Sequence, residues 1–367
     1  MITKIFYRLA NIAPSKASII LATVLAATGC AEKAEITAAD ESDINPTKTV
    51  TVLRFSHFMT ANDLINKQVF EPWAQAIETD SNGRLKVEIY PSATLSKPGV
   101  TYEASAKGTI DIGMQAHGYT AGRFPLTQIV ELPGLSNSAE QQSCILHKLY
   151  DDGVITKEYE DTHLLYMIGT GPGALHTIDK PLRTPADMKG LRIRQPSAVA
   201  SYIIDTVGAS PVGMPAPDTY TSLQRGVIDG LCFAWQPIRA FRLDELVNTH
   251  TNIPFYSAAL VVSMNKDKYD SLPDDLKRVL DSHSGKSMAA QAAKVFDVAN
   301  AEVMAAARAK GDIIIDVPDP LTDPDWSGPL IEGSQKYLDE VSASGLDAQA
   351  VYDKAKIASL ACQTTDK

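Results

Sequence analysis

The sequence contains few cysteines, and none has a metal-binding spacing. The four cysteines are Cys30, Cys144, Cys232 and Cys362. Because no Cys-x-x-Cys pair occurs, a zinc site is not indicated. If Cys30 is consumed by lipid modification, three cysteines remain, and an odd number does not make a disulfide framework. We therefore expect buried thiols, with at most one pair among them.

Recognisable catalytic signatures are also missing. The chain has no Gly-x-Ser-x-Gly elbow and no His-Glu-x-x-His, and its seven histidines are not spaced for metal binding along a helix. The sequence Gly169-x-Gly171-x-x-Ala174 formally fits a dinucleotide fingerprint, but Pro172 leaves no helix to receive a pyrophosphate. We predict no enzyme, no cofactor and no indicated cation. The segment 169–174 instead suits a crossover close to a ligand or between two domains.

Positive charge is scarce. Lys and Arg number 34 against 44 Asp and Glu, which gives a formal net charge of −10. An acidic chain without a basic stripe is a poor candidate for binding nucleic acid. A small anion needs only a few local positive groups. The length of 367 residues and the hydrophobic content of 44% fit a globular protein of one large or two medium domains.

The N-terminus has the features of a targeting segment. Basic residues precede an apolar run at 17–28, which is too short to span a membrane and ends at Gly29-Cys30. This end resembles a bacterial lipoprotein cleavage site, although the match is imperfect. We predict a signal peptide over 1–29, lipid attachment at Cys30, and a flexible acidic tether over 30–49. Ordinary secretion and a retained anchor are the alternatives.

The folded part begins near Val50 and alternates strands with helices. Strands are expected at 50–57, 85–90, 110–114, 164–168, 191–194, 211–214, 257–264 and 313–315. Helices are expected at about 62–79, 99–107, 138–155, 198–207, 216–225, 272–310 and 330–359, the last with a break near Gly345.

The β-α-β-α-β order at the start of the folded part predicts a parallel α/β sheet. Ligands of such sheets bind beyond the carboxyl ends of the strands. That edge would hold His57 and the segment 114–119, which includes Gln115, His117 and Tyr119.

A short strand with two arginines lies within the stretch 187–236. Residues 191–194 alternate apolar and basic side chains, so Arg192 and Arg194 share one face, and Pro196 ends the strand. A guanidinium at a strand end suits a planar anion, which it can bind through two parallel hydrogen bonds. The plainer reading is a surface strand residue. Arg123 is a second candidate, or a structural partner of an acid.

Three blocks in this stretch resemble the solute-binding receptors of TRAP transporters (the DctP type). They are Asp-Met-Lys-Gly-Leu-Arg-Ile-Arg-Gln-Pro (187–196), Gly-Met-Pro-x-x-Asp-x-Tyr (213–220) and Leu-Gln-Arg-Gly-Val-Ile-Asp-Gly (223–230). Supporting blocks are Asp-Ile-Gly-Met (111–114), Gly-Tyr-Thr-Ala-Gly-Arg-Phe-Pro (118–125) and Ser-Leu-Pro-Asp-Asp-Leu (271–276). The likeness covers residues from about 50 to about 345.

The resemblance implies a two-lobed, periplasmic-binding-protein-like α/β fold whose lobes are joined by crossing strands and a long helix. Lobe I would comprise 50–172 and about 258–300, and lobe II 173–257 and about 301–360. The receptor would work in the periplasm, anchored through Cys30, and would deliver an organic acid to a membrane permease of one small and one large subunit. A C4-dicarboxylate receptor of the same kind, an ABC-type receptor and a periplasmic enzyme on a two-domain scaffold are the alternatives.

The resemblance also assigns Arg194 as the clamp for the ligand carboxylate. Ala174 stands where sialic-acid receptors of this kind have another arginine, and 231–236 replaces a Gln-Glu-Asn sequence. Both departures favour a monocarboxylate with an apolar or aromatic body, such as a 2-oxo or aromatic acid. Polar groups in the loops near three of the histidines would bind any second polar group on the ligand. The expected ligand-binding residues are Arg194, Trp235, Phe233, Gln236, His176, Tyr119, His117, Gln115, Arg123, His57 and Met214.

Overall fold

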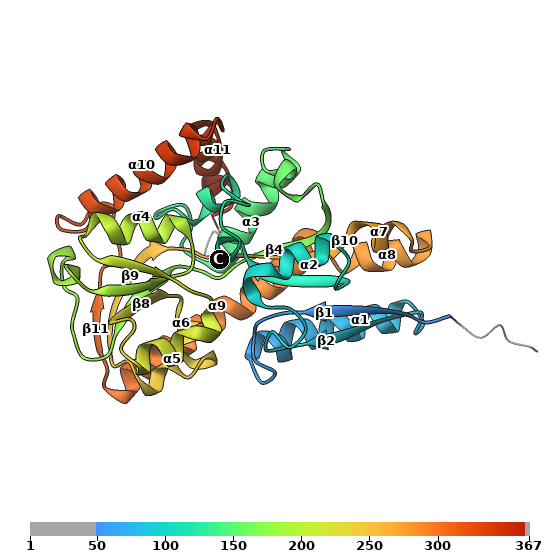
Figure 1. The fold of residues 1–367 in the computed structure, drawn as a ribbon, viewed down its shortest axis with the longest axis horizontal. Coiled ribbons are helices and arrows are strands. Elements are labelled where there is room, and N and C mark those ends of the chain that lie inside the picture. Colours follow the sequence, from blue (N-terminus) through green and yellow to red (C-terminus); the bar gives the residue numbers. More distant parts are fainter. Residues whose placement is uncertain (1–48, 364–367) are drawn as a thin grey trace, which may run out of the picture. The chain divides into compact units, whose positions relative to one another are not determined.

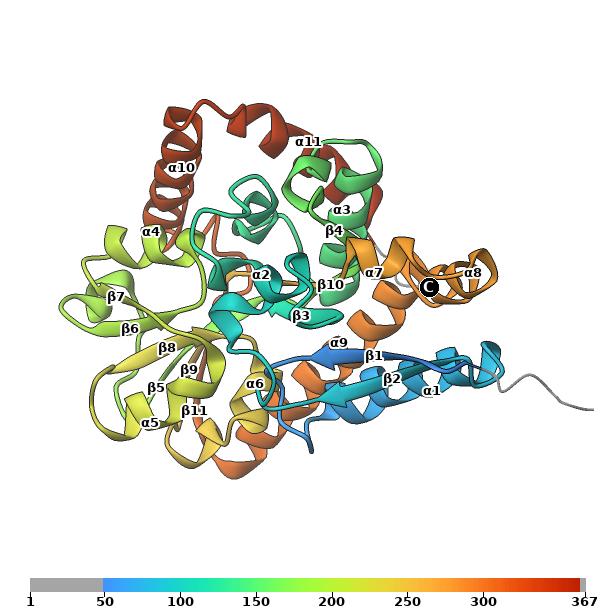
Figure 2. The same cartoon turned by 45° about the vertical axis from the view of Figure 1, so that its right-hand side comes forward.

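The computed structural model describes residues 49–363. The predicted signal peptide, the lipid site Cys30 and almost all of the predicted tether lie outside the described residues. The described chain builds two β-sheets, each covered by helices (Figures 1 and 2). We call each sheet with the helices packed on it a lobe.

The first lobe contains a five-stranded sheet. Its strands lie in the order β2 (Leu85–Tyr90), β1 (Thr51–Ser56), β3 (Ile112–Ala116), β10 (Ala259–Asn265) and β4 (Thr162–Gly169). Strand β1 is parallel to β2 and β3, as the β-α-β order predicted. Strand β10 is antiparallel to both of its neighbours, β3 and β4. The sheet is therefore mixed and not purely parallel. The exception is β10, which follows β9 (Thr249–Tyr256) of the second sheet after only two residues and not a helix of this lobe.

The second lobe contains a six-stranded sheet. Its strands lie in the order β11 (Ile313–Asp316), β9 (Thr249–Tyr256), β5 (Gly173–Thr177), β8 (Gly230–Phe233), β6 (Arg192–Gln195) and β7 (Ser210–Gly213). Strands β5, β8 and β9 were not predicted. Every residue of β5 and β8 is buried, so neither strand shows an alternation of polar and apolar residues. Strand β9 contains Pro254, which argues against a strand when only the sequence is read.

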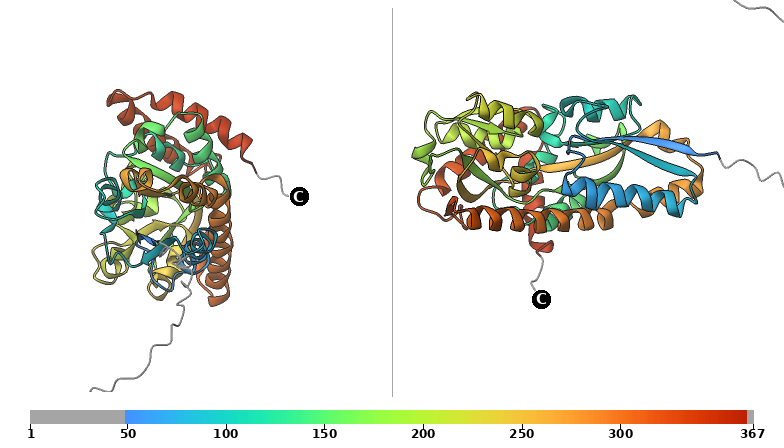
Figure 3. Two further views of the ribbon diagram at one scale, coloured as in Figure 1. Left: turned by 90° about the vertical axis from the view of Figure 1, so that its right-hand side faces the viewer. Right: turned by 90° about the horizontal axis from the view of Figure 1, so that it is seen from below.

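Three connections join the lobes. Residues 170–172 lead from β4 directly into β5, and residues 257–258 lead from β9 into β10. Helix α9 (Gly285–Lys310) packs against elements of both lobes (Figure 3). The interpretation of 169–174 as a crossover between two domains is confirmed. Asn300 of α9 fixes this crossover, because its Nδ2 donates to Thr170 O at 2.9 Å.

The remaining helices cover the sheets. On the first lobe they are η1 (Asn66–Phe70), which continues into α1 (Glu71–Asp80), α2 (Thr101–Ala106), α3 (Ala139–Asp151), α7 (Lys266–Asp270) and α8 (Asp274–Ser282). On the second lobe they are α4 (Ala198–Thr206), α5 (Thr219–Gln224), α6 (Trp235–Ala240) and α10 (Ser327–Ala343). Their buried apolar faces form the core together with the sheets.

The C-terminal helices reach both lobes. Helix α10 lies on α4, whereas α11 (Ala348–Ala361) lies beside α3 (Figure 1). The predicted break near Gly345 is confirmed, and its φ of +88° is one that glycine adopts without strain. A disulfide between Cys144 and Cys362 ties the end of α11 to α3. These two residues form the single pair that the sequence left possible, and a pairing across 218 positions leaves no local signal that would identify it. Cys232 is a buried free thiol, which was the default expectation.

Candidate functional site

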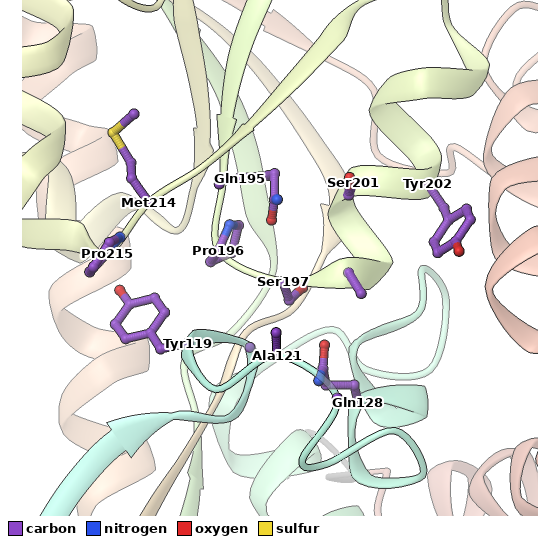
Figure 4. A pocket seen from close by; sticks show the side chains of 14 residues that line it. Tyr119, Ala121, Gln128, Gln195, Pro196, Ser197, Ser201, Tyr202, Met214 and Pro215 are labelled. Atoms are coloured by element: carbon purple, nitrogen blue, oxygen red, sulfur yellow. The ribbon is translucent and has the colours of Figure 1, made fainter. Parts of the chain in front are cut away.

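A cavity of about 470 Å³ lies between the lobes, where the carboxyl ends of β3, β6 and β7 meet (Figure 4). The first lobe contributes Gly118 and Tyr119 from the turn η3 (His117–Tyr119) and Gln128 from the turn η4 (Thr127–Glu131). The second lobe contributes Gln195, Ser197 and Met214, among other residues. The volume falls within the usual range of small-molecule sites.

The lobes approach each other closely beside this cavity. A Cβ atom at Gly118 would lie 2.3 Å from Pro196 O and 2.4 Å from Ser197 Cβ. Any larger residue at position 118 would push the lobes apart. The glycine is therefore required for this close approach of the two lobes.

Arg194 is fully buried next to the cavity, at the end of β6. Its Nε donates to Met214 O at 3.1 Å, its Nη1 to Cys232 O at 3.2 Å, and its Nη2 to the Tyr119 hydroxyl at 3.4 Å. The guanidinium carbon lies 4.2 Å from the centroid of the Phe233 ring. These contacts use three of the five guanidinium N–H groups and hold its plane fixed.

Arg194 carries a charge that no described residue neutralises. Arg192, two positions earlier, forms an exposed ion pair with Asp229 at 2.7 Å. Arg123 likewise pairs with Asp161 at 2.5 Å. Among residues 49–363, no carboxylate forms an ion pair with Arg194. A buried unpaired charge costs several kcal/mol, so the site favours a bound anion.

Polar side chains near the cavity keep unused hydrogen-bonding atoms. Within the described part of the chain, Gln128 Oε1, Gln195 Oε1, Ser197 Oγ and Glu131 Oε2 are buried without a hydrogen-bond partner. The other Glu131 oxygen accepts a bond from Ala259 N at 3.3 Å. Burial raises the pKa of Glu131 from 4.5 to about 8, so this carboxyl is mostly protonated at neutral pH.

The structure brings four of the predicted site residues together. Tyr119, Met214 and Phe233 all contact the guanidinium of Arg194. The Tyr119 hydroxyl also accepts a bond from Ala216 N at 2.9 Å. These residues come from the ends of β3, β6, β7 and β8, which is the edge where a ligand was expected.

Trp235 and His176 lie deeper in the second lobe and do not line the cavity. Trp235 donates from Nε1 to Asn252 Oδ1 at 3.1 Å, and its ring packs edge-on against His176. His176 Nδ1 lies 2.7 Å from His250 Nδ1, and its Nε2 lies 3.1 Å from Phe233 O. Burial lowers the pKa of His176, so the ring is neutral.

His117 and His57 are also buried away from the cavity lining. His117 Nδ1 lies 2.9 Å from Ala259 O and its Nε2 lies 2.7 Å from the Tyr159 hydroxyl. His57 Nε2 lies 2.9 Å from Asn66 Oδ1. Burial lowers the pKa of each histidine to about 4. Both histidines are therefore neutral and packed inside the protein. Contact between either of them and a ligand stays a prediction.

The two predicted glutamines are bonded within the protein. Gln115 Oε1 accepts a bond from Tyr102 N at 2.9 Å. Gln236 donates from its backbone N to Asn300 Oδ1 at 2.8 Å and from Nε2 to Asp63 Oδ2 at 3.0 Å. Gln236 therefore links the second lobe to the first, and lies beside a different cavity from the one next to Arg194.

The sequence did not single out Gln128, Glu131, Gln195 or Ser197. Gln195 and Ser197 flank Pro196 directly after the arginine strand, and this position was a usable signal. Gln128 and Glu131 lie in a loop region whose residues showed no periodicity, so only the fold brings them to the cavity.

The described residues show no sign of a metal site or a membrane span. Within 49–363, His, Cys, Asp and Glu side chains do not gather in groups of three or more that could hold a metal ion. No helix in that range combines the length and the apolar character needed to cross a membrane.

Comparison with known proteins identifies the family. The model of the bacterial extracellular solute-binding protein family 7 (DctP) matches residues 55–326. The chain belongs to this family. Its members are transport receptors that bind small organic acids and work with a membrane permease. The predicted resemblance to TRAP receptors is thereby confirmed.

Solved structures agree with this assignment. A marine metagenome TRAP solute-binding protein specific for aromatic acids, in complex with 3-hydroxybenzoate, is 30% identical with a TM-score of 0.81, over 86% of this chain and 100% of that one. A TRAP solute-binding protein of Rhodoferax ferrireducens with copurified benzoate is 29% identical with a TM-score of 0.78, over 85% and 98%. The two-lobed fold predicted from the sequence is therefore confirmed.

A curated relative extends the range of ligands. The 2,3-diketo-L-gulonate-binding periplasmic protein of Escherichia coli is 28% identical over 213 residues, which is 56% of this chain and 63% of that protein. Receptors similar to this chain thus include proteins named for an aromatic acid and for a 2-oxo acid.

Proposed function

We propose that this TRAP receptor captures a monocarboxylate with an aromatic or 2-oxo body in the periplasm and delivers it to its membrane permease. The observation that carries the proposal is the buried guanidinium of Arg194, which has an aromatic ring on one face and no carboxylate partner among the described residues. In this proposal the ligand carboxylate accepts two charge-assisted hydrogen bonds from Arg194.

The surroundings of Arg194 suit an apolar ligand body. The ring of Phe233 lies against the guanidinium and stacks on Phe241, and Tyr119 contacts Phe58. Lobe closure removes water from this region and strengthens the interaction between the two charges. The closed form, with Gly118 against the second lobe, is then the form that the permease would recognise.

A single cation at the site favours one carboxylate over two. The cavity lining itself includes no Lys or Arg, so Arg194, directly behind Tyr119 and Met214, is the cation nearest to it. Arg123 is already paired with Asp161. A C4-dicarboxylate would bring a second charge for which the described lining offers no partner. The relatives with bound benzoate and 3-hydroxybenzoate support an aromatic acid, and the 2,3-diketo-L-gulonate receptor supports a 2-oxo acid as the second candidate.

Calorimetric titration of the purified protein with benzoate, phenylpyruvate and succinate tests this function. We expect the variant Arg194→Gln to bind the preferred acid about 30-fold or more weakly, because a desolvated charge pair is worth roughly 2–5 kcal/mol. The control Arg192→Gln removes an exposed, already paired arginine and should bind normally. Equal affinity in Arg194→Gln, or tighter binding of succinate, would contradict the proposal. Recovery of chemically altered ligand after long incubation would point to an enzyme instead.

The lipid anchor at Cys30 belongs to the same proposal. Labelling of cells with a radioactive fatty acid should mark the wild-type protein and not Cys30→Ala. Label on both proteins, or on neither, would contradict lipid attachment at Cys30.

A further inference from the structure

One wall of the cavity beside Arg194 is polar, and several of its polar atoms have no hydrogen-bond partner among the described residues. We call this wall the polar wall. Gln128 and Ser197 are each 3% exposed, yet Gln128 Oε1 and Ser197 Oγ have no hydrogen-bond partner among the described residues. Gln195 Oε1 is buried and unpartnered in the same way. All three residues line the cavity. Buried polar atoms are almost always paired in folded proteins, so a cluster of three at one cavity requires an explanation.

The polar wall combines both lobes. Gln128 comes from η4 of the first lobe, and its side chain points up toward Ser197 in Figure 4. Gln195 and Ser197 belong to the second lobe, on either side of Pro196. Gln128 therefore joins Gln195 and Ser197 only where the two lobes meet. A ligand group held by them would be bound by both lobes at once.

The chemistry of the wall selects the kind of group that fits. The unpartnered atoms of Gln128 and Gln195 are amide oxygens, which only accept hydrogen bonds, so a ligand that satisfies them supplies a donor. A keto oxygen cannot do this, whereas a hydroxyl donates one bond and can accept another from Ser197.

Glu131 adds no negative charge that would change this choice. Its carboxyl is buried close to Ser197, and burial raises its pKa to about 8, so it is mostly neutral at pH 7. The Ser197 hydroxyl lies close enough to the Glu131 carboxyl to oppose that rise, although the two groups do not meet the geometry of a hydrogen bond. The wall is thus uncharged and matches a neutral hydroxyl better than a second ion.

We propose that Gln128, Gln195 and Ser197 bind a hydroxyl group on the body of the ligand, so that the receptor prefers hydroxylated monocarboxylates over their unsubstituted counterparts. This inference rests on the proposed function, in which Arg194 holds the carboxylate. It adds that the polar wall, and not Arg194, decides between acids that differ only in a hydroxyl.

The test uses a matched pair of acids, benzoate and 3-hydroxybenzoate, titrated calorimetrically into the wild-type protein and two variants. We expect the wild type to bind 3-hydroxybenzoate about 10-fold more tightly, since each hydrogen bond contributes roughly 0.5–1.5 kcal/mol. In Gln128→Leu and, separately, in Ser197→Ala, that ratio should fall toward one. The control Gln335→Leu changes an exposed glutamine of α10 and should keep the wild-type ratio. Thermal unfolding of each variant verifies that it is folded.

The possible outcomes distinguish failure of the hydroxyl preference from failure of the proposed function. If the wild type binds neither of these acids nor phenylpyruvate, the proposed function falls and this inference falls with it. If it binds phenylpyruvate alone, the carboxylate clamp stands and the preference for a hydroxyl is overturned. If the wild type binds both acids with equal affinity, or the ratio is the same in all four proteins, only the role of the polar wall is overturned. If both acids weaken equally in Gln128→Leu and Ser197→Ala, these residues serve closure or folding and do not read a hydroxyl.

Discussion

The lobes meet at two places, which differ in how many of their buried polar groups find a hydrogen-bond partner within the protein. At the first, which we call the seam, Gln236 Nε2 of the second lobe donates to Asp63 Oδ2 of the first lobe at 3.0 Å. Asn300 extends the seam by accepting from Gln236 N and donating to the crossover residue Thr170. Most polar groups of the seam are paired by the protein itself, with Gln236 Oε1 as the exception.

At the second place, the cavity beside Arg194, the polar groups are left over. The guanidinium of Arg194 has no ion-pair partner within 49–363, and Gln128, Gln195 and Ser197 each keep an unpartnered buried atom. The cavity is the region where a ligand would complete the interactions that the protein leaves open.

This difference indicates how closure depends on ligand. A paired seam stabilises the closed form by only about 1 kcal/mol per hydrogen bond, whereas each unsatisfied buried polar group costs about 1–3 kcal/mol. Closure without ligand would therefore leave the polar groups of the cavity buried and unsatisfied, at that free-energy cost. A ligand that satisfies the cavity shifts the equilibrium between the open and closed forms, because it binds the closed form more tightly.

The largest expected effect concerns the disulfide, which lies outside both the seam and the cavity. Because its loss should change stability and not ligand affinity, it is a reference for the predictions about those two places. Replacing the disulfide by Cys144→Ser with Cys362→Ser should lower the free energy of unfolding by about 2–5 kcal/mol, because the bond closes a very long loop of the unfolded chain. Ligand affinity should stay within twofold. Denaturant unfolding and calorimetry measure the two quantities. A tenfold loss of affinity would show that α11 takes part in closure.

The next effect tests the cavity side of the comparison. Gly118→Ala places a Cβ about 2.3 Å from Pro196 O, so the closed lobes must separate. We expect ligand affinity to fall by about 10- to 100-fold, or roughly 1.4–2.8 kcal/mol, with little change in unfolding of the ligand-free protein. The control Gly328→Ala lies in α10, where an added Cβ meets no atom within 4 Å. If Gly118→Ala binds normally, the contact between Gly118 and Pro196 does not limit closure.

A third effect uses the buried carboxyl near the cavity. Glu131 has a pKa of about 8 in the folded protein against an ordinary 4.5, so the folded state binds the extra proton and stability falls as pH rises between these values. The buried histidines, with lowered pKa values of about 4, act in the opposite direction and only below about 6.5. Between pH 6.5 and 8, the ionisation of Glu131 should by itself cost about 1.4 kcal/mol per pH unit, in addition to any cost from other buried carboxyls such as Glu158, whose pKa burial also raises.

The variant Glu131→Gln keeps the shape of the side chain and cannot ionise. Its stability advantage over the wild type should therefore grow by about 2 kcal/mol from pH 6.5 to pH 8. Denaturant unfolding at a series of pH values measures this difference. A constant difference across the range would mean that Glu131 is not held neutral beside the cavity.

Much of the fold could be predicted from the sequence, because local patterns carried it. The strands at 51–56 and 85–90, the long helix over 285–310 and the break near Gly345 all follow from side-chain periodicity or from a glycine at a turn. Strands β5, β8 and β9 could not be predicted, because they are buried on both faces or contain a proline. Their pairing depends on partners that lie far away in the sequence.

The candidate site divides in the same way. Arg194 stood out because it ends a short strand within a recognisable block, and the structure shows it buried and unpaired. Its role as a clamp remains a prediction. Gln128 and Glu131 carry no local signal, since the folded arrangement alone brings η4 against the start of α4. One disulfide was left possible, but its two cysteines could not be named for the same reason, because they lie 218 positions apart.

The smallest expected effect tests the seam. Gln236→Met keeps the volume of the side chain and removes the hydrogen bond to Asp63. Because one such bond contributes about 1 kcal/mol to the closed form, affinity should fall by about fivefold for every ligand alike. In the variant Asp63→Asn the amide oxygen can still accept from Ile65 N, and the amide NH2 can donate to Gln236 Oε1 after the Gln236 amide turns over, so its affinity should stay closer to that of the wild type.

The pattern across ligands decides what Gln236 does. If Gln236 only joins the lobes, benzoate and 3-hydroxybenzoate must weaken by the same factor in Gln236→Met, since closure is common to both. If Gln236 touches the ligand, as the sequence led us to expect, one acid must weaken more than the other. A selective loss would place the ligand at the seam and break the distinction between a paired seam and an unpaired cavity. An equal loss would confine recognition to the cavity beside Arg194.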